Sequence, residues 1–256
     1  MINTLTAPVA VFDSGVGGIG VLREIQKLLP HENLLYFGDN ARAPYGNRDP
    51  DEIRALVLTH ARRLLDTAKA LVLACNTATA VAVTPLRERY PTVPIVGMEP
   101  AVKPALHVTD HPRILILATA ATLREQKLAQ LLERFRERAA FDLCAASGLV
   151  SLVEGGLADS ERALDYLKVL LAPFSGNRRP DAVVLGCTHF PFAARTISRA
   201  LGADIPLFDG ALGTAKELAH RLRDQELLNP QKSPGQVTVT SSDPHALALC
   251  QRLLYG

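Results

Sequence analysis

Short apolar runs alternate with longer segments of helical periodicity along most of the chain. The runs have the length and β-branched content of buried strands, and the longer segments place apolar residues every three or four positions. Strands are predicted at residues 8–12, 33–37, 71–74, 93–96, 113–118, 141–145, 182–186, 205–208 and 237–240. Helices are predicted at residues 19–29, 51–65, 78–90, 123–138, 164–171, 193–200, 211–223 and 246–254. This alternation predicts an α/β fold with parallel sheets flanked by helices.

Two segments of the chain repeat one pattern. Residues 71–80 (LVLACNTATA) and 183–192 (VVLGCTHFPF) each contain an apolar strand, a small residue and a cysteine followed by two polar residues. The repetition predicts two similar lobes, each with a cysteine at the carboxyl end of a strand, where ligands of open α/β sheets bind. We assign residues 1–98 and 208–256 to the first lobe and 99–207 to the second, and expect the active site in the cleft between them.

The four cysteines divide into two pairs by their surroundings. Cys144, in a predicted strand, and Cys250, on an apolar helix face, fit the ordinary role of cysteine as a small hydrophobe. Cys75 and Cys187 stand at strand exits instead, where the positive end of a following helix favours a thiolate. Neither has the neighbouring ligands of a metal site. Two thiols on facing lobes suit inversion at a carbon, because one can remove a proton while the other returns one from the opposite side.

The glycine turn at residues 15–20 (GVGGIG) permits three interpretations. It fits a dinucleotide-binding fingerprint, and Asp39 lies about 20 residues further on, where a ribose-binding acid would stand. However, Asp13 and Ser14 occupy the start of the turn, and a carboxylate there would repel a pyrophosphate. The glycines are explained more simply by a tight strand–helix turn. A third interpretation is favoured: Asp13 and Ser14 receive the polar groups of an amino acid at a helix N-terminus.

Composition and charge narrow the classes of function. The net charge is only +2, without a dense basic block, so no nucleic-acid partner is expected. No segment approaches the ~18 consecutive apolar residues of a membrane span. The first residues have neither a charged leader nor a long apolar core. We therefore expect a cytoplasmic protein with reduced thiols and no membrane partner.

A series of motifs adds a family resemblance. FDSGVGGIGVL, YFGDNARAPYG, LACNTATA, VGMEPAVKPA, LATAAT, LVEGG and LGCTHFPF follow one another over residues 10–215. With them the chain resembles the glutamate racemases of the aspartate/glutamate racemase superfamily. The resemblance implies interconversion of L- and D-glutamate by Cys75 and Cys187, without pyridoxal phosphate, metal or other cofactor, to supply D-glutamate for peptidoglycan. It implies a small amino-acid substrate, and it leaves a homodimer open.

The same resemblance assigns supporting roles to individual residues. Asp13, Glu154 and His189 are implied to tune the two thiols. The implied substrate-binding residues all lie in the quoted motifs and are Asp13, Ser14, Pro44, Tyr45, Gly46, Asn76, Thr77, Thr119, Thr122, Thr188 and His189. His189 favours glutamate as the substrate, because aspartate racemases tend to carry an acidic residue at that position.

Other functions remain open at this point. The nearest alternative is a racemase of aspartate or a related amino acid. A second is a non-catalytic amino-acid-binding protein with a similar two-lobed cleft, which would bind its ligand without exchanging the Cα proton. A nicotinamide oxidoreductase is the third, and it rests on the glycine turn alone.

Overall fold

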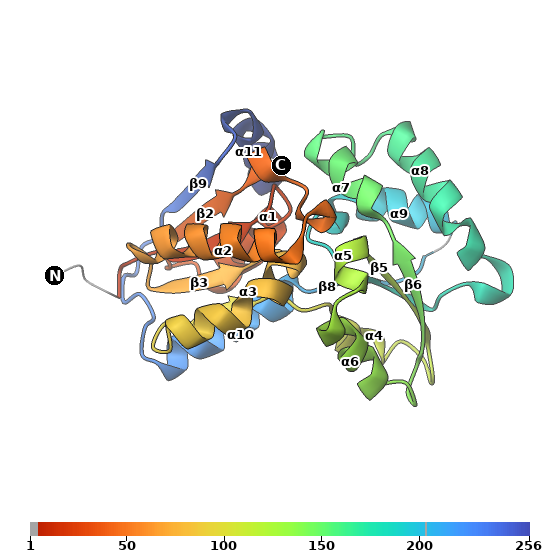
Figure 1. Ribbon diagram of the computed structural model, residues 1–256, viewed down its shortest axis with the longest axis horizontal. Coiled ribbons are helices and arrows are strands. Elements are labelled where there is room, and N and C mark those ends of the chain that lie inside the picture. The colour runs from red at the N-terminus through yellow and green to blue at the C-terminus, as the bar shows by residue number, and fades with distance from the viewer. Residues whose placement is uncertain (1–4, 203) are drawn as a thin grey trace. The chain divides into compact units, whose positions relative to one another are not determined.

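The computed structural model describes residues 5–202 and 204–256, which form two compact units (Figure 1). The first unit holds the described residues up to Glu99 together with Ala211–Gly256, and the second holds those of Pro100–Gly210. Residues 1–4 and 203, which the predicted lobes include, lie outside the described residues. No helix in the described part of the chain is long and apolar enough to cross a membrane.

The first unit is built on a five-stranded sheet in the order β4-β3-β1-β2-β9, with every neighbouring pair parallel. Its strands are β1 (Val9–Asp13), β2 (Leu34–Gly38), β3 (Ala70–Leu73), β4 (Ile95–Gly97) and β9 (Val237–Ser241). Its helices are α1 (Ile19–Leu28), α2 (Pro50–Leu65), α3 (Asn76–Arg89), α10 (Ala211–Asp224) and α11 (Leu247–Tyr255). Helix α1 packs against α10 and α11, while α2 packs against α3.

The second unit is built on a four-stranded parallel sheet in the order β6-β5-β7-β8. Its strands are β5 (Arg113–Ala118), β6 (Ala140–Ala145), β7 (Ala182–Leu185) and β8 (Leu207–Asp209). Its helices are α4 (Val102–Ala105), α5 (Ala120–Leu123), α6 (Gln126–Arg134), α7 (Ser147–Glu154), α8 (Glu161–Leu171) and α9 (Ala194–Leu201). The chain returns to the first unit after Gly210, because β8 is still paired with β7.

The two sheets share one topology. Taken from one edge, the first sheet reads β4-β3-β1-β2 and the second reads β8-β7-β5-β6. In each unit, therefore, the first strand along the chain pairs with both the second and the third, and the fourth lies beyond the third. The predicted α/β fold with two similar lobes, each a parallel sheet flanked by helices, is confirmed. The additional strand β9 extends the first sheet beyond β2.

Continuous apolar runs form the central strands because both faces of each sheet are covered. In β1, Ala10 and Phe12 belong to one core cluster, while Val9 and Val11 alternate with them and are equally buried. In β5, Ile114 and Ile116 face a second cluster. The strands are thus anchored on both sides, which holds the loops at their carboxyl ends in place.

The predicted helix at residues 123–138 is wrong as a single element. Helix α5 ends at Leu123 and α6 begins at Gln126, because Glu125 has an extended backbone with φ −69° and ψ 129°. The apolar spacing nevertheless continues through the break. Leu123, Leu128 and Phe135 all pack into the same core cluster, so periodicity alone shows no interruption.

Candidate active site

The predicted site residues of the first unit gather at the carboxyl edge of its sheet. Asp13 is the last residue of β1, and Cys75 follows β3, which lies beside β1. A hydrogen bond of 2.8 Å from the Ala74 amide to the Phe12 carbonyl continues that pairing up to the cysteine. The Ser14 Oγ lies 3.5 Å from the Cys75 Sγ. The structure therefore brings the first thiol and the first polar turn into contact.

Cys75 is the N-cap residue of α3. Its backbone is extended, and its Sγ accepts a hydrogen bond of 3.4 Å from the Ala78 amide. The helix starts at Asn76, two residues earlier than the apolar pattern predicts, because the cysteine itself caps it. The side chain is almost fully buried. The hydrogen bond from the Ala78 amide and the positive end of the helix both favour negative charge on this sulfur.

The side chain of Asp13 is hydrogen-bonded to the backbone of the glycine turn. Its carboxylate accepts a hydrogen bond of 2.8 Å from the Gly15 amide, and the Gly15 carbonyl accepts one of 2.5 Å from the Tyr36 hydroxyl. A Cβ on Gly18 would lie 2.7 Å from the Asp13 Cβ, so close packing requires glycine there. The backbone amide that would face a pyrophosphate is already bonded to a carboxylate. This arrangement argues against the nicotinamide interpretation.

The residues that follow Cys75 are also buried. Asn76 and Thr77 form the first turn of α3, and each is less than a tenth exposed. Neither the Oδ1 nor the Nδ2 of Asn76 has a hydrogen-bond partner among the described residues. Buried amide groups are normally satisfied, so this one can accept and donate toward a ligand.

The turn that contains Pro44, Tyr45 and Gly46 is held by a buried carboxylate. Tyr45 and Gly46 are buried within the short 3-10 helix η2 (Tyr45–Asn47), and Pro44, half-buried, precedes it after a cis peptide bond. The Tyr45 hydroxyl donates a hydrogen bond of 2.7 Å to the Asp39 Oδ2. The sequence motifs suggest Asp39 only as a candidate ribose-binding acid. No pattern along the chain indicates its actual partner.

The second unit places its cysteine at the equivalent strand exit. Cys187 follows β7, and the Gly186 amide donates a hydrogen bond of 2.8 Å to the Leu117 carbonyl of β5. Thr119 directly follows β5, caps α5 by accepting from the Thr122 amide at 3.2 Å, and lies 3.0 Å from the Thr122 Oγ1. Thr119, Thr122 and Cys187 thus belong to one edge of this sheet.

The backbone after Cys187 differs from that after Cys75. A turn and the 3-10 helix η5 (Phe190–Ala193) separate Cys187 from α9, so this cysteine does not cap an α-helix. The expected helix N-terminus is therefore found at Cys75 and is absent at Cys187. Pro191 is the second residue of this 3-10 helix, and α9 begins only at Ala194.

Instead of a helix N-terminus, Cys187 has a histidine beside it, and a carboxylate holds that histidine. The His189 Nδ1 lies 3.7 Å from the Cys187 Sγ, and its Nε2 lies 2.5 Å from the Oε1 of Glu154, the last residue of α7. Burial alone would lower the pKa of His189, but Cys187 and Glu154 outweigh it and raise that pKa well above its usual value. Thr188, between the two, is buried as well. An imidazolium here places a positive charge and a hydrogen-bond donor beside the sulfur.

Replacing Glu154 by Gln is expected to destabilise the protein most on the acidic side of neutrality. A histidine whose pKa is higher when folded contributes stability that is complete below about pH 6.5 and is lost as the pH rises through the folded-state pKa. Glu154 is one of the groups that raise the pKa of His189. The loss in urea midpoint should therefore be larger at about pH 6 than at about pH 9.

The control for this prediction is Glu161→Gln on α8. Glu161 pairs with Arg199 at 3.0 Å, both side chains are well exposed, and no histidine is involved. This variant should change the urea midpoint little and equally at both pH values. A pH-independent loss in Glu154→Gln would contradict the prediction.

Comparison with known proteins agrees with the geometry of each unit. Residues 19–218 match the Asp/Glu/Hydantoin racemase family. A glutamate racemase of Clostridium botulinum is 40% identical over 237 residues, covering 92% of this chain and 92% of that protein. A glutamate racemase isoform of Bacillus anthracis has a TM-score of 0.86 at 31% identity, covering 97% of this chain and 94% of that chain.

A further solved structure is of glutamate racemase from Francisella tularensis in complex with D-glutamate. Its TM-score is 0.82 at 28% identity, and the match covers 98% of this chain and 95% of that chain. These likenesses extend over nearly the whole chain and include both units. The chain therefore belongs to the glutamate racemases of the Asp/Glu/Hydantoin racemase family.

Proposed function

We propose that this protein interconverts L- and D-glutamate without a cofactor, with Cys75 and Cys187 as the two acid–base groups at Cα. The observation that carries the proposal is the equivalence of the two strand exits. Each unit presents a buried cysteine after its third strand, in the same position of the same topology. The substrate is inferred from relatives named glutamate racemase and from one that holds D-glutamate.

In the proposed reaction, one cysteine acts as a thiolate and the other as a thiol. The thiolate takes the Cα proton, and the electron pair of the broken C–H bond stays on the substrate, delocalised into its carboxylate. The other thiol then delivers its proton to the opposite face of Cα. The two sulfurs have exchanged protonation states, which prepares the reverse reaction. The scheme requires the two units to present their sulfurs to opposite faces of Cα.

Each sulfur lies beside polar groups that can interact with it, and these groups differ between the two units. Cys75 has the N-terminus of α3 and the Ser14 hydroxyl. Cys187 has His189, which Glu154 holds from its other ring nitrogen. A cysteine removes a proton from carbon only as the thiolate. Each thiol can therefore start the reaction from its own side.

Asn76 supports an amino-acid substrate in particular. Its side chain offers one acceptor and one two-hydrogen donor, both unsatisfied within the described residues. A zwitterion carries a matching ammonium donor and carboxylate acceptor, so binding would remove the cost of the buried, unpaired amide. Asp13, Ser14 and Thr77 lie in the adjoining turns, and the proposal gives them polar contacts with the same substrate.

The proposed biological role follows from the product. D-glutamate would supply peptidoglycan synthesis in the cytoplasm, as the family resemblance implies. The relative that is 40% identical is named a glutamate racemase, which supports D-glutamate as the product on which this role depends.

The direct test is racemisation by the purified protein in deuterium oxide without added cofactor. Either enantiomer of glutamate should lose its optical activity, and the product should carry deuterium at Cα by NMR. Aspartate, measured in parallel, should turn over much more slowly. Binding of glutamate without exchange at Cα would indicate a binding protein instead, and faster turnover of aspartate would assign a different substrate.

A further inference from the structure

We propose that Asp39 is a positioning residue for the reaction: through the Tyr45 hydroxyl it holds the turn of residues 44–46 against the end of α3 that carries Cys75. This inference rests on the proposed function, since it assigns a role at the same site. Asp39 is not a catalytic residue in this scheme, because nothing requires it to touch substrate. It acts through Tyr45.

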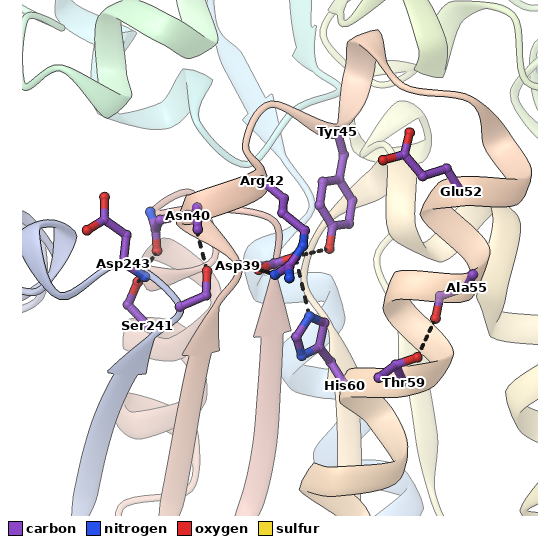
Figure 2. A network of polar contacts seen from close by, with 12 residues as sticks. Asp39, Asn40, Arg42, Tyr45, Glu52, Ala55, Thr59, His60, Ser241 and Asp243 are labelled. Atoms are coloured by element: carbon purple, nitrogen blue, oxygen red, sulfur yellow. Dashed lines mark hydrogen bonds and ion pairs between the residues drawn. The ribbon is translucent and has the colours of Figure 1, made fainter.

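Asp39 is buried and surrounded by donors from several segments (Figure 2). The Arg42 Nη1 lies 2.9 Å from its Oδ1, and the Tyr45 hydroxyl lies 2.7 Å from its Oδ2. The His60 Nε2, from α2, lies 3.4 Å from the same Oδ2. Figure 2 shows Tyr45 and His60 directed toward the carboxylate from different elements. Asp39 therefore joins the loop after β2 to the helix that follows it.

The backbone of Asp39 is anchored at the sheet edge as well. Its amide donates a hydrogen bond of 3.0 Å to the carbonyl of Asp13, the residue that organises the glycine turn. Two residues further on, the Ala41 amide donates one of 3.0 Å to the Ser242 Oγ, after β9. One end of the loop is thus attached to the sheet. The Tyr45 hydroxyl extends that attachment to the turn six residues away.

The ring of Tyr45 packs into the buried cluster that also contains the first thiol. Tyr45, Cys75 and Ala78 belong to the same buried cluster, and η2 packs against α3. Burial and the hydrogen bond to Asp39 raise the pKa of Tyr45 well above its usual value, so the hydroxyl stays protonated and donates. Any shift of the ring would move the turn relative to the N-terminus of α3.

A purely structural role explains this carboxylate poorly. Burial raises the pKa of Asp39, yet hydrogen bonds from His60 and Tyr45 hold that pKa well below its usual range, so the group is charged. Buried charges recover their desolvation cost only with several well-placed partners, and apolar residues of similar size often stabilise a fold at least as well. The ring of Phe12 stacks on His60 and that of Phe37 is tilted against it, so an apolar core is already present here. What the charge adds is a fixed direction for the Tyr45 hydroxyl.

The test is a double-mutant cycle of Tyr45→Phe and Asp39→Asn, followed by kcat and KM for both glutamate enantiomers. Tyr45→Phe removes one hydroxyl and leaves the ring packing in place. Loss of a hydrogen bond to a charged group should lower kcat/KM by about 10- to 100-fold, mainly by raising KM. The double variant should lose little more than either single variant, because both remove the same connection.

The matched control is Asp49→Ala, at the start of α2. Its side chain caps that helix by accepting from the Asp51 and Glu52 amides, and it is exposed and outside the Asp39 network. This change should lower the Tm while leaving KM near the parent value. If Asp39→Asn does not fold, the KM of Tyr45→Phe still tests the positioning role.

Three results would contradict these proposals, and they separate the proposed function from the positioning role. A parent protein that fails to racemise glutamate would overturn the proposed function itself. A racemising parent whose Tyr45→Phe variant keeps its KM would overturn the positioning role alone. Losses that multiply in the double variant would also overturn it, since Asp39 would then act independently of Tyr45.

Discussion

Cys75→Ser and Cys187→Ser are each expected to lower racemisation of glutamate by roughly 10²- to 10⁴-fold, the range of a lost acid–base group. The reason is that inversion needs both sulfurs, one to remove the proton and one to return it. Each variant keeps one thiol, however. It should still exchange the Cα proton for deuterium, with retention of configuration, in the enantiomer whose proton faces that thiol. The enantiomer that exchanges should be opposite in the two variants.

The remaining cysteines provide the controls. Cys144 is buried in β6, where burial raises the pKa of its thiol to about 11, and Cys250 is buried in α11. Replacing either by Ala should leave racemisation near the parent value, although the cavity will lower stability. Near-full racemisation by Cys75→Ser or Cys187→Ser would refute the two-thiol scheme. Exchange of the same enantiomer in both variants would place the two sulfurs on one face of Cα.

Lys69→Met is expected to lower the free energy of unfolding by about 3–5 kcal/mol, as removal of one partner of a buried ion pair does. The Lys69 Nζ lies 2.6 Å from the Glu32 Oε2, and the two side chains are 2% and 3% exposed. Glu32 also accepts a hydrogen bond of 2.7 Å from the Asn229 amide. Without the ammonium, the carboxylate remains buried with an uncompensated charge. Urea unfolding at neutral pH measures the loss.

The double variant Glu32→Gln/Lys69→Met should recover much of that loss. Burial lowers the pKa of Lys69 by more than Glu32 raises it, so the ammonium is not favoured overall by its site. A glutamine at position 32 keeps an acceptor for the Asn229 amide without a charge. Arg199→Gln, which removes an exposed pair, should cost only about 0–1 kcal/mol. A double variant no more stable than Lys69→Met would contradict this account.

The sequence predicted the strands well and the helices less evenly. In β5 the five residues after Arg113 are all apolar because both faces of the sheet are covered, and that pattern is visible in the sequence alone. Helix α7 was not predicted. Its buried residues Leu149, Leu152 and Val153 do have helical spacing, but the helix has only 8 residues, too few for the period to repeat. The break at Glu125 was missed because the apolar period continues across it.

From the residue pattern, the candidate site was predictable only where a reactive side chain stands directly at the end of a strand. Asp13 and Cys75 stand at strand exits of the first sheet and Cys187 at one of the second, and each parallel sheet brings its own strand exits to one edge. The partners of Asp39 could not be found this way. Tyr45 lies in an irregular loop and His60 near the end of a helix, and their meeting depends on the path of that loop. Long-range packing of this kind leaves no period in the sequence.

The discontinuity of the first unit has a consequence for its synthesis. Ile19, Leu22 and Ile25 are buried on α1, which packs against α10 and α11, and both of these helices come after Pro100–Gly210 in the chain. At translation rates of roughly 5–20 residues per second, the apolar face of α1 is synthesised on the order of ten seconds before α10 and α11, which pack against it. Meanwhile the contiguous second unit emerges from the ribosome with all of its strands. The unit begun first is thus the one completed last.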